Sequence, residues 1–154
     1  YEKGQVDGAV TFDPYRAQLL RAGATTLFDS TQIPGEIVDL IAVRASVLDK
    51  QPKAVQTLLS GWFSAIDYLK REPKDAAHRM GVRQQTSGEQ FLQALKGLHI
   101  PSREENLKML GGAEPGLVAT GGRLMALMLD AKLLQTRVKI EEILAPGPLA
   151  SLAR

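Results

Sequence analysis

The stretch that decides the predicted fold reads Gly4-Gln5-Val6-Asp7-Gly8-Ala9-Val10-Thr11-Phe12-Asp13-Pro14-Tyr15. Its apolar run over residues 6–12 predicts a β-strand, and Tyr15 opens a segment with apolar residues at helical spacing. Asp13 is a favoured helix N-cap, because its carboxylate can accept from unpaired backbone N–H groups of the first turn. Pro14 suits the first helical position, where no N–H is needed. The stretch therefore predicts a strand that runs directly into a helix.

Two more apolar runs extend this pattern. Residues 25–28 follow a helix stop at Gly23 and are β-branched and aromatic. Residues 37–43 are almost continuously apolar, which is typical of a buried strand, and Asp39 is the one polar residue among them. Strands thus crowd the first 44 residues and helices fill the rest. The predicted fold class is α/β.

The helical signal strengthens from Ala45 onward. Over residues 52–71 apolar residues recur at three- and four-residue steps, and Trp62 lies on that stripe, which predicts a core position for it. Pro73 ends this helix. Further helices are predicted over residues 74–80, after a capping signal at Ser87 or Thr86, after a second signal at Ser102, and from residue 117. The last helix is predicted over residues 138–144, ahead of a Pro146-Gly147-Pro148 tail.

The end of the first predicted strand is the best place to seek a ligand site. In open α/β sheets ligands bind beyond the carboxyl ends of strands, where helix N-termini present free N–H groups. Asp13 is a candidate ligand contact, although capping alone accounts for it. Thr11 offers a hydroxyl, Tyr15 an aromatic wall, and Phe12 either a ligand contact or core packing. Asp39 is either a further ligand contact or a partner of neighbouring backbone N–H groups.

Composition bounds the function. The 154 residues are 44% hydrophobic, enough for the core of one ordinary domain, and 19 basic against 17 acidic residues give a net charge of +2. No face is saturated with Lys and Arg, so a nucleic-acid partner is unsupported. The absence of cysteine fits either the bacterial envelope or the cytosol. Any signal peptide is expected upstream of Tyr1, and residues 117–134 carry too many charges for a membrane span.

No catalytic or metal-binding constellation stands out, and no cofactor is expected. His78 and His99 lie far apart, each without an acidic or serine neighbour in a recognisable arrangement. The adjacent pairs Glu104-Glu105 and Glu141-Glu142 point in different directions on a helix, which argues against paired-carboxylate catalysis. The glycine pairs at 111–112 and 121–122 lack the Lys-Ser/Thr of a phosphate loop. These residues therefore give no support to an enzymatic function, and we expect none.

Residues 4–14 resemble the G-x-(V)-D-A-x-x-x-W-E-P segment of periplasmic solute-binding proteins of the nitrate, sulfonate and taurine transporter family, which also holds the thiamine-precursor binders. The likeness rests on the order and spacing of loose motifs and continues through residues 27–30, 38–44, 52–55 and 128–134. Phe12-Asp13 stands where Trp-Glu is frequent in the family. An aspartate facing the ligand opposes the anion preference of a helix N-terminus, so the solute should carry an amine or another donor. The family's enzymatic branch, which makes a thiamine pyrimidine, depends on a cysteine-rich motif that this chain lacks.

The resemblance implies part of a type II periplasmic binding protein fold. Residues 1–36 would form the end of lobe 2, residues 37–44 a hinge-crossing strand, and residues 45–154 the helical C-terminal part of lobe 1. The chain would then start in the middle of its fold and leave sheet edges unpaired. We expect a dimer, a strand exchange or an altered packing in that case.

The implied function is that of the solute-binding component of an ABC importer, in the periplasm or on the extracytoplasmic face of the membrane. It would hold a small organic solute (sulfonate, nitrate, amine or pyrimidine) in an interlobe cleft, and the membrane permease would recognise the closed form. Two alternatives stay open, a ligand-sensing domain of a membrane receptor and an unrelated cytosolic α/β enzyme domain. A transmembrane helix and signalling domain after Arg154 would favour the receptor, and a secretory signal upstream of Tyr1 would exclude the cytosolic enzyme.

Overall fold

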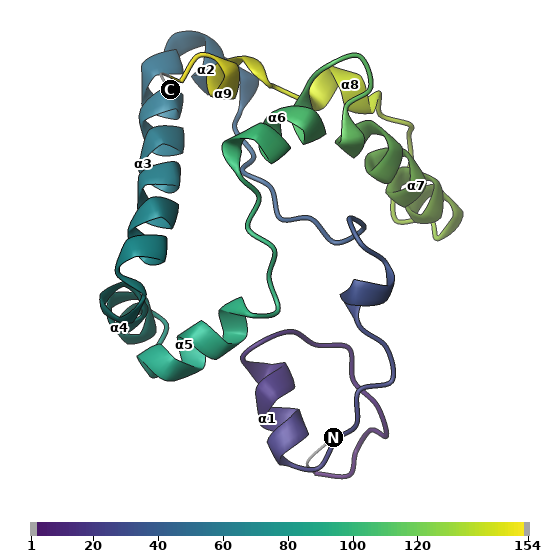
Figure 1. Cartoon of the computed structure of the whole chain (residues 1–154). Helices are drawn as coiled ribbons and strands as arrows, with labels where there is room; N and C mark the ends of the chain where they lie inside the picture. The colour runs from purple at the N-terminus through teal and green to yellow at the C-terminus, as the bar shows by residue number, and fades with distance from the viewer. Residues whose placement is uncertain (1–2, 153–154) are drawn as a thin grey trace. The chain divides into compact units, whose positions relative to one another are not determined.

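Helices joined by irregular loops make up residues 3–152, the part of the chain that the computed structural model describes (Figure 1). The chain divides into two compact units. Unit 1 contains Tyr1–Ile37 and Tyr68–His99, and unit 2 contains Val38–Asp67 and Ile100–Arg154. Each unit is described by itself below.

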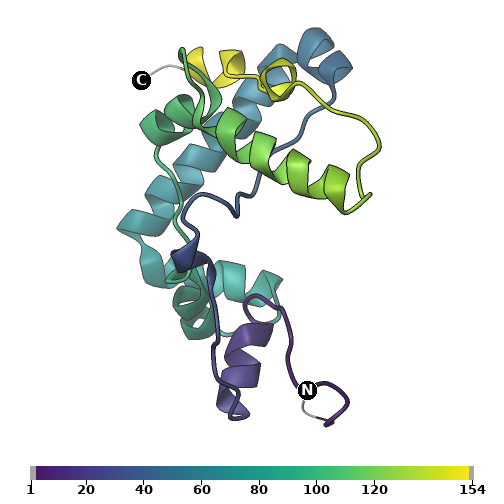
Figure 2. The same ribbon diagram turned by 90° about the vertical axis from the view of Figure 1, so that its right-hand side faces the viewer.

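The α/β prediction is wrong for the described residues. The three predicted strands, residues 6–12, 25–28 and 37–43, are irregular, and neither Figure 1 nor Figure 2 shows a strand arrow within residues 3–152. Apolar side chains in these segments are exposed, Val10 completely and Leu27 to 92%. The sheet expected of a type II binding protein fold is therefore absent from residues 3–152, and the division into lobes stays a prediction.

The physical reason lies in where the backbone hydrogen bonds go. A helix closes its bonds between residues four apart, whereas a strand needs a second strand beside it to pair its N–H and C=O groups. Within residues 3–152 none of the three apolar runs pairs with another in a ladder. Strand propensity without a partner does not produce a strand.

Unit 1 holds, in chain order, α1 (Tyr15–Arg21), the 3-10 turn η1 (Ser30–Gln32), the last residues of α3 (Pro52–Arg71), α4 (Pro73–Arg83) and α5 (Gly88–Leu95). Helix α1 ends at the predicted stop, because Gly23 takes a φ of 90° that favours glycine. The turn η1 follows Asp29, whose carboxylate accepts from the N–H of Thr31 at 3.0 Å. Hydrogen bonds from Thr31 lower the pKa of Asp29.

Helices α4 and α5 pack against each other as a hairpin (Figures 1 and 2). Ala76 and Ala77 of α4 are buried. A Cβ placed on Gly88 would lie 3.2 Å from the carbonyl carbon of Ala77, and a Cβ on Gly81 would lie only 2.8 Å from the carbonyl oxygen of Thr86. Small residues therefore let the two backbones come into direct contact.

Both predicted capping signals are confirmed. Before α5, the N–H of Gln90 donates to Ser87 Oγ at 3.1 Å, and the N–H of Ser87 donates to Gln90 Oε1 at 3.0 Å. Before α6 (Arg103–Leu110), the N–H of Glu105 donates to Ser102 Oγ at 3.2 Å, and the N–H of Ser102 donates to the Glu105 carboxylate at 2.7 Å. Each box satisfies two backbone donors, one at the N-cap and one in the first turn.

Unit 2 holds α2 (Ala45–Lys50), the first part of α3, α6, α7 (Gly116–Asp130), α8 (Ile140–Ile143) and α9 (Gly147–Ala150). Helix α7 packs on α6 and on α8, and α9 packs on α6. Helix α8 is shorter than the predicted helix over residues 138–144. The tail beyond it contains α9, so the prediction that residues 138–144 form the last helix is wrong. Leu149, only 3% exposed, holds the tail in place through its buried apolar side chain.

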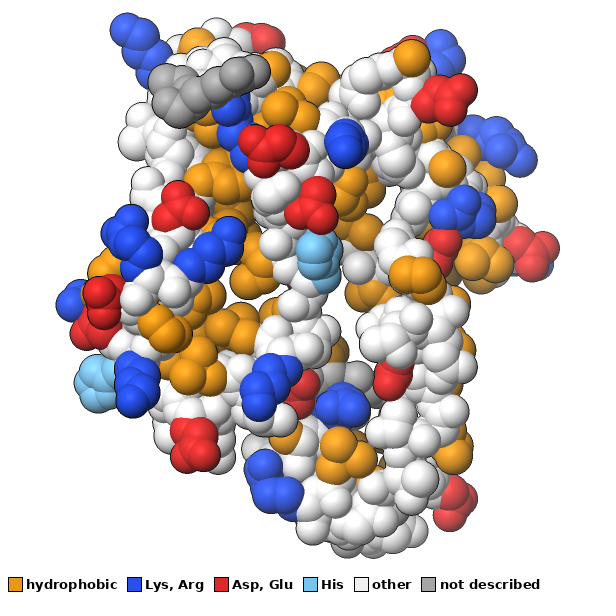
Figure 3. Space-filling view, viewed as in Figure 1, with side chains coloured by type: hydrophobic (Ala, Val, Ile, Leu, Met, Phe, Trp, Pro, Cys, Tyr) orange, Lys and Arg blue, Asp and Glu red, His pale blue; other side chains and the backbone are white. Residues whose placement is uncertain are grey.

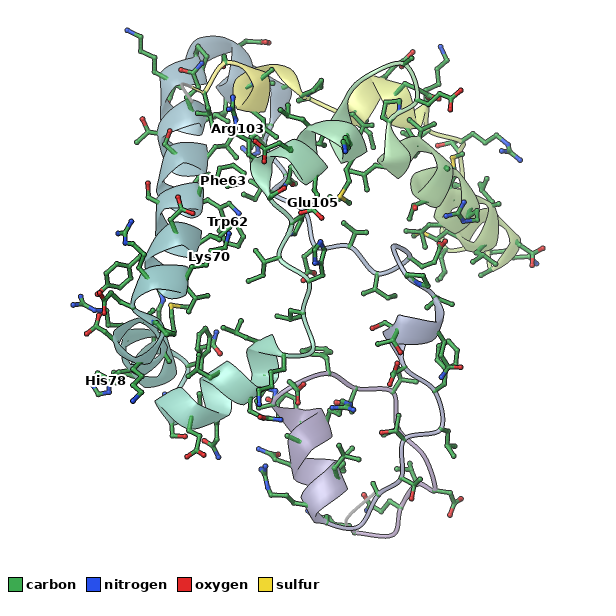
Figure 4. The ribbon with its side chains drawn as sticks, in the orientation of Figure 1. Trp62, Phe63, Lys70, His78, Arg103 and Glu105 are labelled. Atoms are coloured by element: carbon green, nitrogen blue, oxygen red, sulfur yellow. The ribbon has the colours of Figure 1, made fainter. Side chains whose placement is uncertain are left out.

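Residues 146–152, here called the C-terminal strap, contact both ends of α6. At the C-cap of α6, a Cβ on Gly111 would lie 3.2 Å from Cβ of Pro146. At the other end, Arg103 donates from Nη2 to the carbonyl oxygen of Leu152 at 2.7 Å. Figure 4 shows Arg103 at the start of α6, beside α9. The strap is thus fastened along α6 from one end to the other.

The strap also holds the beginning of α3. Gln56 donates from Nε2 to Ser151 Oγ at 2.9 Å, and the neighbouring Val55 is buried. The predicted helix over residues 52–71 is confirmed with both its ends. Trp62 is nevertheless 48% exposed, so its predicted core position is wrong (Figure 4). Within residues 3–152, Val55 is the one residue of α3 that is buried.

The apolar core is small. Among residues 3–152 the buried apolar side chains are Val55, Ala76, Ala77, Leu117 and Leu149. Over α3 and α4, apolar side chains reach the surface between charged ones (Figure 3). The core is smaller than the composition predicts, because amphipathic helices without a sheet cover one another only in part. In the same range of residues, every helix is too short or too polar to cross a membrane.

Candidate functional site

Four of the five predicted site residues lie together in unit 1. Thr11, Phe12 and Asp13 precede α1, and Tyr15 is its first residue. Asp39 lies in unit 2, exposed on the irregular segment before α2. Its carboxylate accepts no hydrogen bond from any residue between 3 and 152, so its predicted alternative role as a partner of backbone N–H groups is wrong.

Asp13 does not cap α1, so its predicted role as the helix N-cap is wrong. The helix begins at Tyr15 with Pro14 in the N-cap position, and no side chain caps it. The reason is local, because the carbonyl oxygen of Phe12 accepts from the N–H of Arg16 at 3.0 Å and so occupies a donor that Asp13 was expected to satisfy.

The Asp13 carboxylate lies against the turn that follows α5. A Cβ placed on Gly97 would lie 3.8 Å from Asp13 Oδ2, and the Asp13 side chain is half-buried. In the described part of the chain no donor pairs with this carboxylate. A partly desolvated carboxylate that neither caps a helix nor forms an ion pair is able to accept hydrogen bonds from a ligand.

Two aromatic side chains flank the carboxylate in sequence. Phe12 is 76% exposed and Tyr15 is 58% exposed, so the predicted core packing of Phe12 is wrong. Thr11 is half-buried, and its Oγ1 makes only a long contact of 3.4 Å with the carbonyl oxygen of Phe12. Exposed aromatic faces beside a carboxylate suit a cationic group, which the ring faces and the charge both attract.

The sequence did not predict the polar cluster of Tyr68, Asp75 and Arg79. Tyr68 donates its hydroxyl hydrogen to Asp75, and Arg79 donates from Nε to the same carboxylate at 2.6 Å. Both hydrogen bonds lower the pKa of Asp75, and the bond to Asp75 raises the pKa of Tyr68. The four-residue spacing of Asp75 and Arg79 is a recognisable helical pair, whereas no spacing rule points to Tyr68 across a helix boundary.

The described residues hold no group of three or more His, Asp and Glu side chains that could bind a metal ion. His78 projects outward from α4 (Figure 4) and is exposed. The candidate residues at positions 11–15 offer a carboxylate, hydroxyls and aromatic side chains.

Comparison with known proteins gives one match. A family model described as the NMT1-like family matches residues 1–84, more than half of the chain, and includes all five candidate residues. The match confirms the resemblance seen in the sequence, although the motif at residues 128–134 lies outside it. No curated protein and no solved structure matches the chain.

Proposed function

We propose, from the premise that this chain belongs to the NMT1-like family, that it serves as the solute-binding component of an ABC import system. Membership supports a solute-binding role in ABC-type transport. The enzymatic branch of the resembled family depends on a cysteine-rich motif, and this sequence has no cysteine. The family match over residues 1–84 is the observation that carries the proposal. The partners are a small solute and a membrane permease, and the place of action is the extracytoplasmic side, typical of the family.

The solute is an organic amine or another molecule with strong hydrogen-bond donors. Asp13 supports this choice, because its carboxylate is half-buried and has no donor among residues 3–152. Phe12 and Tyr15, which are exposed and within two residues of Asp13 in sequence, add aromatic surface to the same segment. A nitrate or sulfonate would meet the negative charge of Asp13 and bind less well, since like charges repel most where water is partly excluded.

A thermal-shift screen of the full chain tests the proposal. Amines, sulfonates, nitrate and pyrimidines are added in turn, and the Tm is recorded. A ligand at 100 times its Kd stabilises the folded state by about 2.7 kcal/mol, because it binds only that state. We expect an amine to raise the Tm and Asp13→Ala to abolish the rise.

Asp7→Ala is the matched control, because Asp7 is an exposed carboxylate of the same stretch. It should leave the amine response intact. A response that survives Asp13→Ala would remove Asp13 from the site and leave the transport role standing. A Tm that none of the four solute classes changes would contradict the proposed function itself.

A further inference from the structure

The boundary between α3 and α4 is an elbow one residue long. Helix α3 ends at Arg71 and α4 begins at Pro73, so Glu72 alone carries the change of direction, with φ −125° and ψ 58°. Pro73 has no N–H, so it makes no helical hydrogen bond back into α3. The last backbone bond of α3 runs from the N–H of Glu72 to the carbonyl oxygen of Tyr68, at 2.8 Å. Backbone hydrogen bonding therefore constrains the elbow angle only weakly.

Side chains span this gap in the backbone bonding. Tyr68, in the last turn of α3, donates to Oδ2 of Asp75, in the first turn of α4. Arg79, one turn further along α4, donates to the same oxygen at 2.6 Å. Tyr68, Asp75 and Arg79, here called the elbow staple, thus join one helix to the other through a single carboxylate oxygen.

Helices α4 and α5, which follow the elbow, pack together as one rigid hairpin. Helices α4 and α5 meet through buried Ala76 and Ala77 and through the close backbone approach at Gly81 and Gly88. Any change at Glu72 therefore moves α4 and α5 together relative to the end of α3.

The elbow staple favours one angle between α3 and α4 but does not fix that angle. The Asp75 side chain is 45% exposed and that of Arg79 71% exposed, and exposed ion pairs contribute little because water and salt screen them. We propose that the elbow at Glu72 is a hinge and that the elbow staple (Tyr68, Asp75 and Arg79) stabilises one hinge angle. This inference rests on the geometry of unit 1 and is independent of the proposed function.

Distance measurements between spin labels test the hinge. The chain has no cysteine, so Ser64→Cys on α3 and Gln93→Cys on α5, both at exposed positions, place two unique labels. Pulsed electron–electron double resonance then gives the distribution of distances between them. We expect Tyr68→Phe and Asp75→Ala each to broaden or shift this distribution, because the first removes the donor on α3 and the second removes the acceptor on α4.

Two controls keep the test decisive. Glu142→Gln breaks a comparably exposed ion pair with Lys139 in unit 2 and should leave the distribution unchanged. Labels at Lys74→Cys and Gln93→Cys, both within the hairpin, should keep their distance in the Tyr68 and Asp75 variants. An unchanged Ser64–Gln93 distribution in both variants would overturn the proposal, and so would loss of the hairpin distance, which would mean that α4 and α5 separate instead of swinging.

Discussion

Arg103 donates from Nη2 to the carbonyl oxygen of Leu152 at 2.7 Å and, more weakly, to that of Leu149 at 3.4 Å, so the first residue of α6 fastens the C-terminal strap. The guanidinium is partly buried, and its Nε has no hydrogen-bond partner in the described part of the chain. A charged donor therefore holds two carbonyl groups at a point with little access to water.

Arg103→Met should detach the strap, because methionine keeps much of the side-chain volume but donates no hydrogen bond. The expected loss in free energy of unfolding is about 1.5–3 kcal/mol, the usual value for a hydrogen bond to a charged group. Hydrogen exchange should accelerate at the backbone amides of α9, and urea unfolding should give the stability change. Lys108→Met, at an exposed position of α6, is the control. Equal stability of the two variants would refute the role of Arg103.

Two adjacent glycines in α7 should respond differently to alanine. A Cβ on Gly122 meets nothing within 4 Å, so Gly122→Ala should raise the free energy of unfolding by about 0.5–1 kcal/mol through helix propensity alone. A Cβ on Gly121 would lie 3.1 Å from Cγ2 of Ile140 in α8, so Gly121→Ala should be less stable than Gly122→Ala. Thermal unfolding of the two variants measures the difference, and a more stable Gly121→Ala would show that α8 does not pack there.

Gly81 in α4 should tolerate no side chain. The added Cβ of Gly81→Ala would lie 2.8 Å from the Thr86 carbonyl oxygen and 2.9 Å from the Gly88 nitrogen, and backbone atoms cannot turn aside as a side chain does. We expect a loss of about 1–3 kcal/mol in the free energy of unfolding, the usual cost of overpacking. Gly61→Ala, in open surroundings on α3, should be neutral or stabilising. Chemical denaturation of both variants provides the test.

Stability should fall in acid partly through Asp75. Hydrogen bonds from Tyr68 and Arg79 hold the pKa of Asp75 below its ordinary value of 3.8, so the unfolded chain binds the proton more readily than the folded chain does. The stabilising contribution is therefore complete above the ordinary pKa and is lost as the pH falls through the lowered one. Urea midpoints measured across this range should depend less on pH in Asp75→Asn than in the wild-type chain. An identical pH dependence in the two proteins would contradict the assignment.

Helix signals proved the most predictable part of the fold. The bounds of α3, the stop of α1 before Gly23 and the capping boxes of Ser87 and Ser102 are all as the sequence predicts. Each depends on groups within about four residues of one another, so the information needed is contiguous in the chain.

The candidate ligand site at residues 11–15 stays a prediction, and two structural roles predicted within it are wrong. The stretch from Thr11 to Tyr15 falls within the family match, whereas the expected capping role of Asp13 and core role of Phe12 are wrong. Capping by Asp13 required its carboxylate to accept from the N–H of Arg16. The carbonyl oxygen of Phe12 accepts that hydrogen bond instead. The burial of Phe12 depended on a sheet that residues 3–152 do not form.

The sequence by itself determined the bounds of α3, the end of α1 and the starts of α5 and α6, because helical hydrogen bonds and caps join near neighbours. Only the tertiary structure decided that the apolar runs of the first 44 residues stay unpaired, that Arg103 fastens the strap and that Gly81 and Gly88 bring α4 and α5 into contact. The physical reason is that a strand, a buried side chain or a distant hydrogen bond needs a partner elsewhere in the chain. The local sequence shows that a strand or a buried side chain requires such a partner, but it does not show whether the folded chain supplies one.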